Sequence, residues 1–324
     1  MKKKRLMMMA SVLTVVAGLG WVAGKTSVSS PVATNEIAVA AMDGNLGDVN
    51  RMLRSGWDVN YGGNLGNTAL MWAAEYGQTR VVRSLLAANA DVNAANRWGQ
   101  TALTLASQWG NEEIAAMLLE HGADVGHSST NGSTALMKAA QYDFDNLVQM
   151  FIDHGADVEQ VDDQGRSAFM VAAEWGSVKS VEKILAFGAN VNREDKKGYT
   201  GLMLAAMNGH EAVVTALLEK GAMDGGKSEC GCTALHLAAA KGYVRVVEAL
   251  LQHGAKVNAL DPRGESPLTL AMVNGRREVV NVLLAHGADR TLRPANGKVI
   301  GERVGPTGET SAVSRLLAKV GALI

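Results

Sequence analysis

The sequence predicts a mainly helical fold, a solenoid in which a short helical hairpin repeats every 33 residues. The first observation is a ladder of glycines at intervals of 33 residues: Gly66, Gly99, Gly132, Gly165, Gly198, Gly231, Gly264 and Gly297. The second is the text between these glycines, which reads as helix, turn and helix. The third is the composition, because 36 glycines, 5 prolines and 5% aromatic residues in 324 are typical of short helices separated by glycine turns rather than of a β-sandwich.

A second ladder of glycines lies eleven residues after the start of each repeat. Its members are Gly44, Gly77, Gly110, Gly176, Gly209, Gly242, Gly275 and Gly308, with Asp143 in the one remaining place. Glycine adopts positive φ freely, and Asp tolerates it better than most residues. We therefore expect this ladder to mark the turn between the two helices of each unit.

The helical pattern is clearest between Gly231 and Ala255. The stretch GCTALHLAA and the later stretch VVEALLQHGA place their apolar residues three to four positions apart, as in two short helices with one buried face. Such helices are too short to stand alone, so we expect stacking on neighbouring units to stabilise them. The segment after the second helix, such as GADVE at 155–159, predicts a hairpin-like finger.

These units resemble the ankyrin repeat family, whose 33-residue repeat carries the text Thr-Pro-Leu-His-x-Ala. The text TALHLA at 233–238 replaces only the proline, and SPLTLA at 266–271 keeps it. The resemblance extends from about residue 33 to 324 and implies a β-hairpin and two antiparallel helices per repeat, stacked as a curved solenoid. We count nine repeats, starting near residues 33, 66, 99, 132, 165, 198, 231, 264 and 297.

The two outer repeats are degenerate, as end caps that face water need to be. The first has Asp48 where inner repeats carry an apolar residue, and the last replaces the Thr-x-Leu text with VIG at 299–301 and continues with the charged residues Glu302 and Arg303. Repeat six also departs, because it reads GAMDGG at 221–226 where its neighbours read Gly-Ala-Asp-Val. We expect its finger to be irregular.

Residues 1–24 have the pattern of an export signal. A basic start, KKKR at 2–5, precedes an uncharged, largely apolar run from Leu6 to Gly24, and small residues precede a cleavage site before Lys25. The 18 residues from Leu6 to Ala23 would make about 27 Å of helix, close to the ~30 Å of a bilayer core. We therefore expect either a cleaved signal peptide and a periplasmic protein, or an anchor in the cytoplasmic membrane that leaves the repeats facing outward; residues 25–32 form a short linker.

The charge and the motifs exclude several function classes. The formal net charge is −1, and without Lys2, Lys3, Lys4 and Arg5 it becomes −1 − 4 = −5, a poor match for nucleic acid. The sequence shows no nucleophile beside a base and no His-Glu-x-x-His, so we expect no catalysis and no cofactor. Apart from the N-terminal segment, nothing indicates contact with a membrane.

The segment 221–228, GAMDGGKS, matches the phosphate-loop pattern. A phosphate loop must follow a buried strand and begin a helix whose amides face the phosphates. Here the segment follows the helix expected at 213–220 and leads into a finger before Thr233. We interpret the match as a coincidence and expect no nucleotide site.

Histidines recur with the period, but the spacing argues against a metal site. Copies in successive repeats would lie roughly 10 Å apart, whereas two zinc ligands must each lie within about 2.1 Å of the ion. We expect these side chains to bind the last carbonyls of the second helix, and by resemblance we expect His236 to tie neighbouring repeats together. The recurring set is His121, His154, His253 and His286.

The only cysteines, Cys230 and Cys232, flank Gly231 at a finger turn. In an exported protein they would meet oxidising conditions. Three alternatives stay open: two free or separately modified thiols, a structural disulfide, or a redox-responsive pair.

The most informative pattern is a set of aromatic residues just before the turn between the two helices. Successive repeats carry Tyr76, Trp109, Tyr142 and Trp175, each preceded by a polar residue: Glu75, Gln108, Gln141 and Glu174. The series then stops at Asn208, Lys241 and Asn274. By resemblance, this end of the first helix faces the concave groove where ankyrin proteins bind partners, and rings at steps of ~10 Å would line it. The competing interpretation is that the rings only pack over the repeat junctions.

We therefore expect a non-enzymatic protein-binding scaffold of the cell envelope. The rings would anchor a partner protein of unknown identity, while finger-tip residues select it: Trp98, Lys196, Lys197 and Tyr199. Four methionines, Met71, Met137, Met170 and Met203, share the place of His236 and are expected to pack between repeats. Two alternatives from other classes are carbohydrate or cell-wall binding through the rings, and redox support of an envelope enzyme through Cys230 and Cys232.

Overall fold

The computed structural model describes residues 35–225 and 228–292, in which helices begin 33 residues apart. The first helix of each pair, here called the inner helix, is α2 (Glu36–Met42), α4 (Ala69–Glu75), α6 (Ala102–Trp109), α8 (Ala135–Gln141), α10 (Ala168–Trp175), α12 (Gly201–Asn208), α14 (Ala234–Lys241) or α16 (Pro267–Val273). The second, outer helix is α3 (Leu46–Arg54), α5 (Thr79–Ala87), α7 (Glu112–Glu120), α9 (Asp145–Asp153), α11 (Val178–Ala186), α13 (Glu211–Glu219), α15 (Val244–Gln252) or α17 (Arg277–Ala285). A short 3-10 turn, η1 (Gly63–Leu65), precedes α4.

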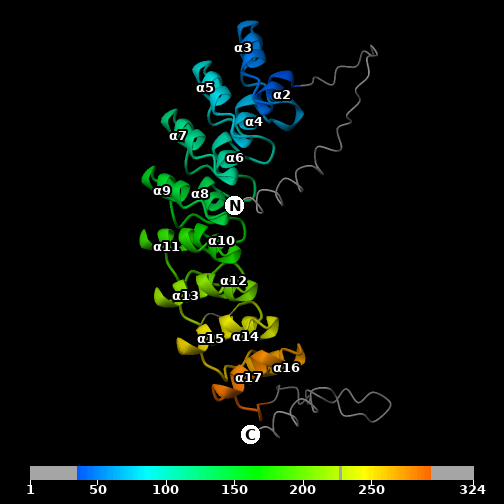
Figure 1. Ribbon diagram of the computed structural model, residues 1–324, viewed down its shortest axis with the longest axis vertical. Helices are drawn as coiled ribbons and strands as arrows, with labels where there is room; N and C mark the ends of the chain where they lie inside the picture. Colours follow the sequence, from blue (N-terminus) through cyan, green and yellow to red (C-terminus); the bar gives the residue numbers. More distant parts are fainter. Residues whose placement is uncertain (1–34, 226–227, 293–324) are drawn as a thin grey trace, which may run out of the picture. The chain divides into compact units, whose positions relative to one another are not determined.

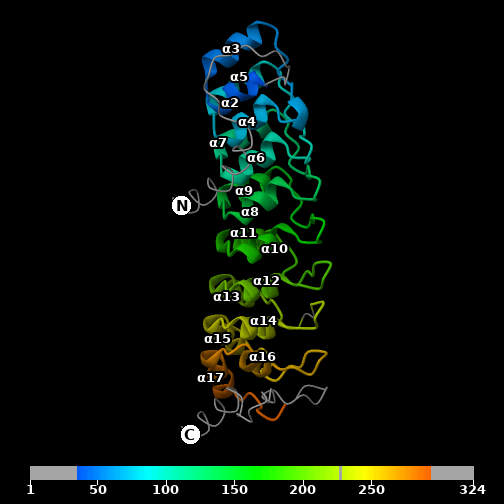
Figure 2. The same ribbon diagram turned by 90° about the vertical axis from the view of Figure 1, so that its right-hand side faces the viewer.

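The helix pairs stack in chain order as two layers. Each inner helix contacts its own outer helix and the inner helices before and after it, and the outer helices form a second row (Figure 1). The loop from each outer helix to the next inner helix projects to one side of the stack (Figure 2). We call this loop a finger and name it by the two helices that it joins. The predicted mainly helical solenoid is confirmed.

Side-chain caps explain where the inner helices begin. The Thr68 hydroxyl accepts a hydrogen bond from the amide of Met71 at 3.3 Å, and Thr134 accepts one from Met137 at 3.2 Å. This is the bond that a Thr N-cap supplies to an otherwise unpaired helical amide. The turns between helices require positive φ as expected: Gly110 has φ 73° and Asp143, in the place of a glycine, has φ 62°.

The core lies between the two rows of helices and between neighbouring repeats. Paired alanines such as Ala139 and Ala140 are fully buried, which lets backbones approach closely. The outer helices contribute a buried Val-Val or equivalent pair and a buried Leu, as at Val246, Val247 and Leu250. The four methionines in the place of His236 are at most 2% exposed, which confirms their packing role.

The fingers have less β structure than the resemblance implies. In the part of the chain that the structure describes, no strand forms, and three fingers carry one isolated antiparallel bridge each: Ser128 with Thr134, Val161 with Ser167, and Glu194 with Thr200. Each bridge closes a tight turn, and the next inner helix begins directly after it. The paired segment is therefore too short for a ladder within one finger.

The first repeat behaves as a cap. Asp48 is partly exposed and forms an ion pair with Arg51, whereas the equivalent residues Val81 and Ile114 are buried. Residues 1–24, the linker at 25–32 and the ninth repeat from Gly297 lie outside the described residues. Within the described ranges, no helix has the length and apolar character needed to cross a bilayer.

Candidate functional site

The four predicted anchor rings occupy one structural position in four consecutive repeats. Tyr76 and Tyr142 are the C-cap residues of α4 and α8, while Trp109 and Trp175 are the last residues of α6 and α10. Because these inner helices contact one another in order, the rings follow a line along the stack. We call Tyr76, Trp109, Tyr142 and Trp175 the aromatic row.

The rings of the aromatic row are not equally exposed. Tyr76 is 41% and Trp175 50% exposed, whereas Trp109 and Tyr142 are partly buried. The ring centroids of Tyr142 and Trp175 lie 6.0 Å apart with a tilt of 60°. The even ~10 Å spacing that we expected is therefore wrong for this pair. Repeat spacing sets the distance between the backbones, but large side chains can lean along the stack until their rings meet.

Two members of the row also contact aromatic rings outside it. The Tyr142 ring also meets Phe144 at 6.2 Å, and the Tyr76 ring meets Trp72 at 6.0 Å. Tyr142 is thus held between two rings, and burial raises the pKa of its hydroxyl. Part of the row is consequently packing, and part, at Tyr76 and Trp175, is open surface.

The polar neighbours of the rings are all partly exposed. Burial raises the pKa of Glu75, although the nearby Trp109 side chain opposes this shift. The Trp109 indole N–H is buried without a partner that meets hydrogen-bond geometry. The Trp109 indole N–H and the Glu75 carboxylate therefore lie close together beside the exposed Tyr76 ring without forming a hydrogen bond.

Glu174 is held by a charged arm from the finger. Arg166, in the α9–α10 finger, places Nη1 2.5 Å from Glu174 Oε2 and donates through Nε to Asp162 Oδ2 at 2.9 Å. Asp162 is 6% exposed and also accepts from the amides of Gln164 and Arg166. The finger is thus joined to the helix end that carries Trp175.

Sequence reasoning missed the cation Lys138 in this cluster. Burial, followed by repulsion from Arg166, lowers the pKa of Lys138, while attraction to Asp162 opposes that shift. A signal existed, because Lys138 occupies the place of Trp72, Leu105 and Val171, where other repeats carry an apolar residue. A charged residue that interrupts an apolar column of a repeat is a candidate for function.

The finger tips present a separate set of side chains. Trp98 is 45% exposed, and the Arg97 guanidinium carbon lies 5.7 Å from the centre of its ring. Lys196 and Lys197 are exposed, and Tyr199 is partly buried. Among the described residues, no hydrogen bond, ion pair or ring contact joins these side chains to the rings of the aromatic row.

The periodic histidines are structural. In each of the four, Nδ1–H donates to the backbone carbonyl four residues earlier, at 2.7 to 2.9 Å, at the end of an outer helix: His121, His154, His253 and His286. His236 is fully buried and joins Thr233 to the carbonyl of Glu265 at 3.1 Å in the next finger. Among the described residues, no group of three or more His, Cys, Asp and Glu side chains is placed to hold a metal.

The phosphate-loop match lies in the α13–α14 finger. Gly221 follows a helix, α13, and not a strand, while Gly226 and Lys227 lie outside the described residues. Asp224 takes the place that Val191 and Val257 hold in neighbouring fingers, and it accepts from the amide of Leu235 at 3.3 Å. Burial raises the pKa of Asp224 to about 6.

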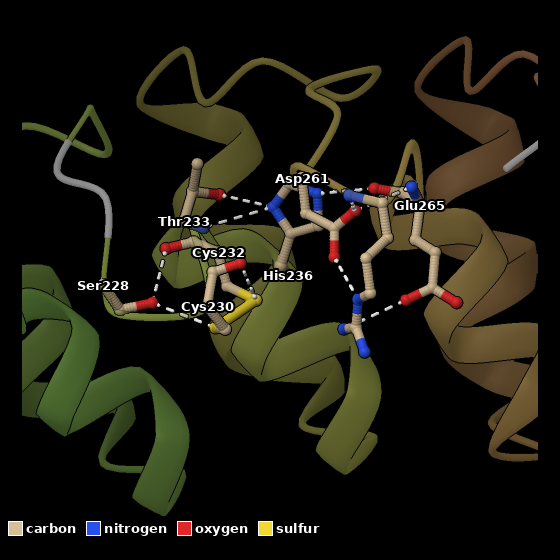
Figure 3. Close-up of a disulfide and its surroundings, with 8 residues drawn as sticks. Ser228, Cys230, Cys232, Thr233, His236, Asp261 and Glu265 are labelled. Atoms are coloured by element: carbon tan, nitrogen blue, oxygen red, sulfur yellow. Dashed lines mark hydrogen bonds and ion pairs between the residues drawn. A yellow bond between two sulfur atoms is a disulfide. The ribbon is translucent and has the colours of Figure 1, made fainter. Parts of the chain in front are cut away.

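The two cysteines form a disulfide in the same finger (Figure 3). Their Cα atoms lie 5.4 Å apart, within the range that a disulfide spans. Cys230 is exposed, whereas Cys232 is 4% exposed. A shallow pocket elsewhere, between α11 and α13, is lined by residues that include Glu182, Glu211 and Glu219, and none of the aromatic row contributes to it.

Comparisons with known proteins agree with this architecture. The family model for ankyrin repeats matches residues 37–129, 125–195, 176–261 and 202–293. The crystal structure of the human ASB11 ankyrin repeat domain is similar, with a TM-score of 0.62 and 28% sequence identity over 68% of this chain and 98% of that domain. No curated protein sequence matches the chain. With a family model that covers most of its length and a solenoid of the same type, the chain belongs to the ankyrin repeat family.

Proposed function

We propose that the repeat domain is a non-enzymatic scaffold that binds a partner protein through the aromatic row and the finger tips beside it. Ankyrin repeats are generally protein-binding scaffolds. The proposal therefore concerns which surface of this chain binds. The aromatic row is favoured because it combines exposed rings with a polar neighbour, Glu174, that is held in place.

The single observation that carries the proposal is the environment of Trp175. Half of this large side chain is exposed, yet its ring rests on Tyr142 at 6.0 Å and its neighbour Glu174 is fixed by Arg166. An exposed ring that is already ordered loses little side-chain entropy on binding. Such rings supply most of the binding free energy in many protein interfaces.

The location in the cell envelope is part of the proposal and rests on residues 1–24 alone. The basic start and the apolar run support export, with either cleavage before Lys25 or retention as an anchor. In both cases the repeats would meet partners outside the cytoplasmic membrane.

The test is affinity capture from envelope extract with three folded proteins: the parent, a variant with all four rings of the aromatic row changed to Ala, and a control. Phe187→Ala is a suitable control, because Phe187 is 46% exposed but lies at the end of the outer helix α11. We expect one protein to be captured by the parent and the control and lost by the ring variant. Titration of that purified protein should then show at least about tenfold weaker binding by the ring variant. Equal capture by all three would overturn the role of the aromatic row.

The same experiment bears on the carbohydrate alternative. Capture of no protein, together with a change in Trp fluorescence on adding saccharide that is lost in Trp175→Ala, would favour stacking on sugar rings. A ring that stacks on a sugar needs at least one open face. The contacts of Tyr142 with Phe144 and Trp175 therefore favour the protein-binding proposal.

A further inference from the structure

Backbone hydrogen bonds join the finger tips to one another in a regular ladder. In five successive rungs, an amide in one finger donates to the carbonyl 32 residues earlier: Arg97 to Leu65, Thr130 to Trp98, Asp163 to Asn131, Lys196 to Gln164, and Glu229 to Lys197, at 2.6 to 3.1 Å. We call this set the finger ladder. It ties each of these five fingers to the one before it.

The finger ladder stops at the α13–α14 finger. The next rung would run from residue 262 to the carbonyl of Cys230, but residue 262 is a proline and has no amide hydrogen. Among the described residues, no backbone hydrogen bond joins this finger to the α15–α16 finger. Instead Pro262 packs against Gly231, where an added Cβ would lie 2.3 Å from Pro262 Cδ.

The same finger lacks the side-chain brace of its neighbours. In four other fingers, one Asn or Asp oxygen accepts from the amides two and four residues later, which closes the turn: Asn96, Asp162, Asp195 and Asp261. Ser228 occupies that place here, and its hydroxyl contacts Cys230 Sγ at 3.1 Å and the carbonyl of Cys232 at 3.2 Å. In the α7–α8 finger, which also has a serine, Asn131 accepts from the amide of Ser133 and closes the turn.

The residues two and four positions after Ser228 are Cys230 and Cys232. The disulfide therefore joins the two positions that a carboxylate or amide oxygen braces in the other fingers (Figure 3). A disulfide, which a reductant can cleave, therefore stands where the other fingers have hydrogen bonds that a reductant does not affect.

The two sulfurs differ in the way that thiol exchange requires. Cys230 is exposed and open to an attacking thiolate, whereas Cys232 is buried. Cys232 directly precedes Thr233, the N-cap of the eight-residue helix α14. A ring closed over a single intervening residue gains little from restricting the unfolded chain.

We propose that the Cys230–Cys232 disulfide is a thiol-disulfide exchange site whose substrate is a dithiol reductant, and that its reduction loosens the finger at which the finger ladder ends. This inference does not depend on the aromatic row.

The exchange balances with a dithiol. One thiolate of the reductant attacks Cys230 Sγ, the disulfide bond breaks, and its electron pair leaves with Cys232 Sγ. The second thiol of the reductant then attacks the mixed disulfide and releases Cys230 as a thiolate. The reductant becomes a disulfide, and its two protons end on the two cysteines or in solvent.

The loosening should stay local. His236, fully buried, still joins Thr233 to the carbonyl of Glu265, so α14 and α16 remain connected. The bond from the Glu229 amide to Lys197 is the one rung that the reduced finger would release.

The first test uses the natural chain. The oxidised, folded protein is treated with dithiothreitol or, in a parallel arm, with a thioredoxin-type protein dithiol. It is then alkylated, and mass spectrometry counts the alkyl groups added. We expect both cysteines to react while the far-UV circular dichroism is unchanged. Reduction by either reagent supports the exchange site. Comparing the two reagents shows whether a protein dithiol, as well as a small one, can reach the disulfide. Alkylation only in denaturant would overturn the proposal, as would finding two free thiols after folding in oxidising buffer.

The second test measures hydrogen exchange of the backbone amides that form the finger ladder. Reduction should raise exchange at Glu229 at least about tenfold and leave Lys196, one rung earlier, unchanged. Equal exchange at Glu229 in both redox states would show that the disulfide does not stabilise the hydrogen bond from Glu229 to Lys197.

A matched pair of variants tests which sulfur is attacked. With glutathione disulfide, Cys232→Ser, which retains the exposed Cys230, should form a mixed disulfide at least about tenfold faster than Cys230→Ser, which retains the buried Cys232. Equal or reversed rates would overturn the assignment of Cys230 as the entry point.

Discussion

Arg166 Nη1 lies 2.5 Å from Glu174 Oε2, so that a finger and the end of an inner helix are joined by one side chain. The same guanidinium donates to Asp162, which is almost fully buried. The position of Glu174 beside Trp175 therefore depends on a carboxylate that lies in the finger rather than in the helix.

Arg166→Ala should lower the free energy of unfolding by about 1–3 kcal/mol, because it removes the ion-pair partner of the buried Asp162 carboxylate. Urea denaturation followed by circular dichroism measures the change. Arg83→Ala is the control, since the Arg83–Glu113 pair is 3.5 Å long and both side chains are exposed, and it should cost less than about 0.5 kcal/mol. Equal losses in the two variants would mean that Asp162 does not need Arg166.

Trp175→Ala should lower the free energy of unfolding by less than about 1 kcal/mol, because half of the ring is already exposed. Met170→Ala, in the same helix but fully buried, should cost about 2–5 kcal/mol. Denaturant titration of both variants gives the comparison. If Trp175→Ala costs as much as Met170→Ala, the aromatic row is packing and the binding proposal loses its main support.

His236→Ala should cost about 2–3 kcal/mol, because it removes a buried side chain that hydrogen-bonds to Thr233 and Glu265. Burial lowers the pKa of His236 in the folded state. The unfolded chain then binds a proton more readily, so the wild type should lose stability as the pH falls below about 6.5, and the variant should lose less over the same range. Thermal unfolding at a series of pH values measures both. His253→Ala, which removes one exposed contact to a helix end, is the control.

Asp224→Asn should remove a pH dependence of the opposite sign. The pKa of Asp224 is raised to about 6 by burial, so the folded state binds the proton more tightly than the unfolded state does. The stability that this proton confers is present at pH 4 and is lost as the pH rises through about 6. The difference in unfolding free energy between the variant and the wild type should therefore grow by about 1–3 kcal/mol between pH 4 and pH 7. A constant difference would show that this carboxylate titrates normally.

Much of the fold followed from the 33-residue period. The glycine ladders placed the turns, and the buried methionines and His236 lie where their shared position predicts. These features depend on contacts within one repeat or between adjacent repeats. Because the residues that make these contacts recur every 33 positions, the sequence alone reveals them. Among the described residues the expected strands do not form, and three fingers close after a single bridge.

The candidate site was less predictable. The contact between Tyr142 and Trp175 depends on how two side chains lean, and no periodicity carries that information. Lys138 and Arg166 come from different repeats, and the repulsion between them depends on how the chain brings the two side chains near each other. The break in the finger ladder at Pro262 could have been read from the sequence only after the offset of 32 residues was known.

The finger ladder also has a mechanical consequence. When the stack is stretched along its length, the rungs are loaded in series, because each backbone rung joins one finger to the next. Pro262 removes a tie and leaves an apolar contact with Gly231 in its place. A pull applied at the C-terminal end should therefore part the fingers first between the α13–α14 and α15–α16 loops, and the repeats before that seam should yield later and at higher force.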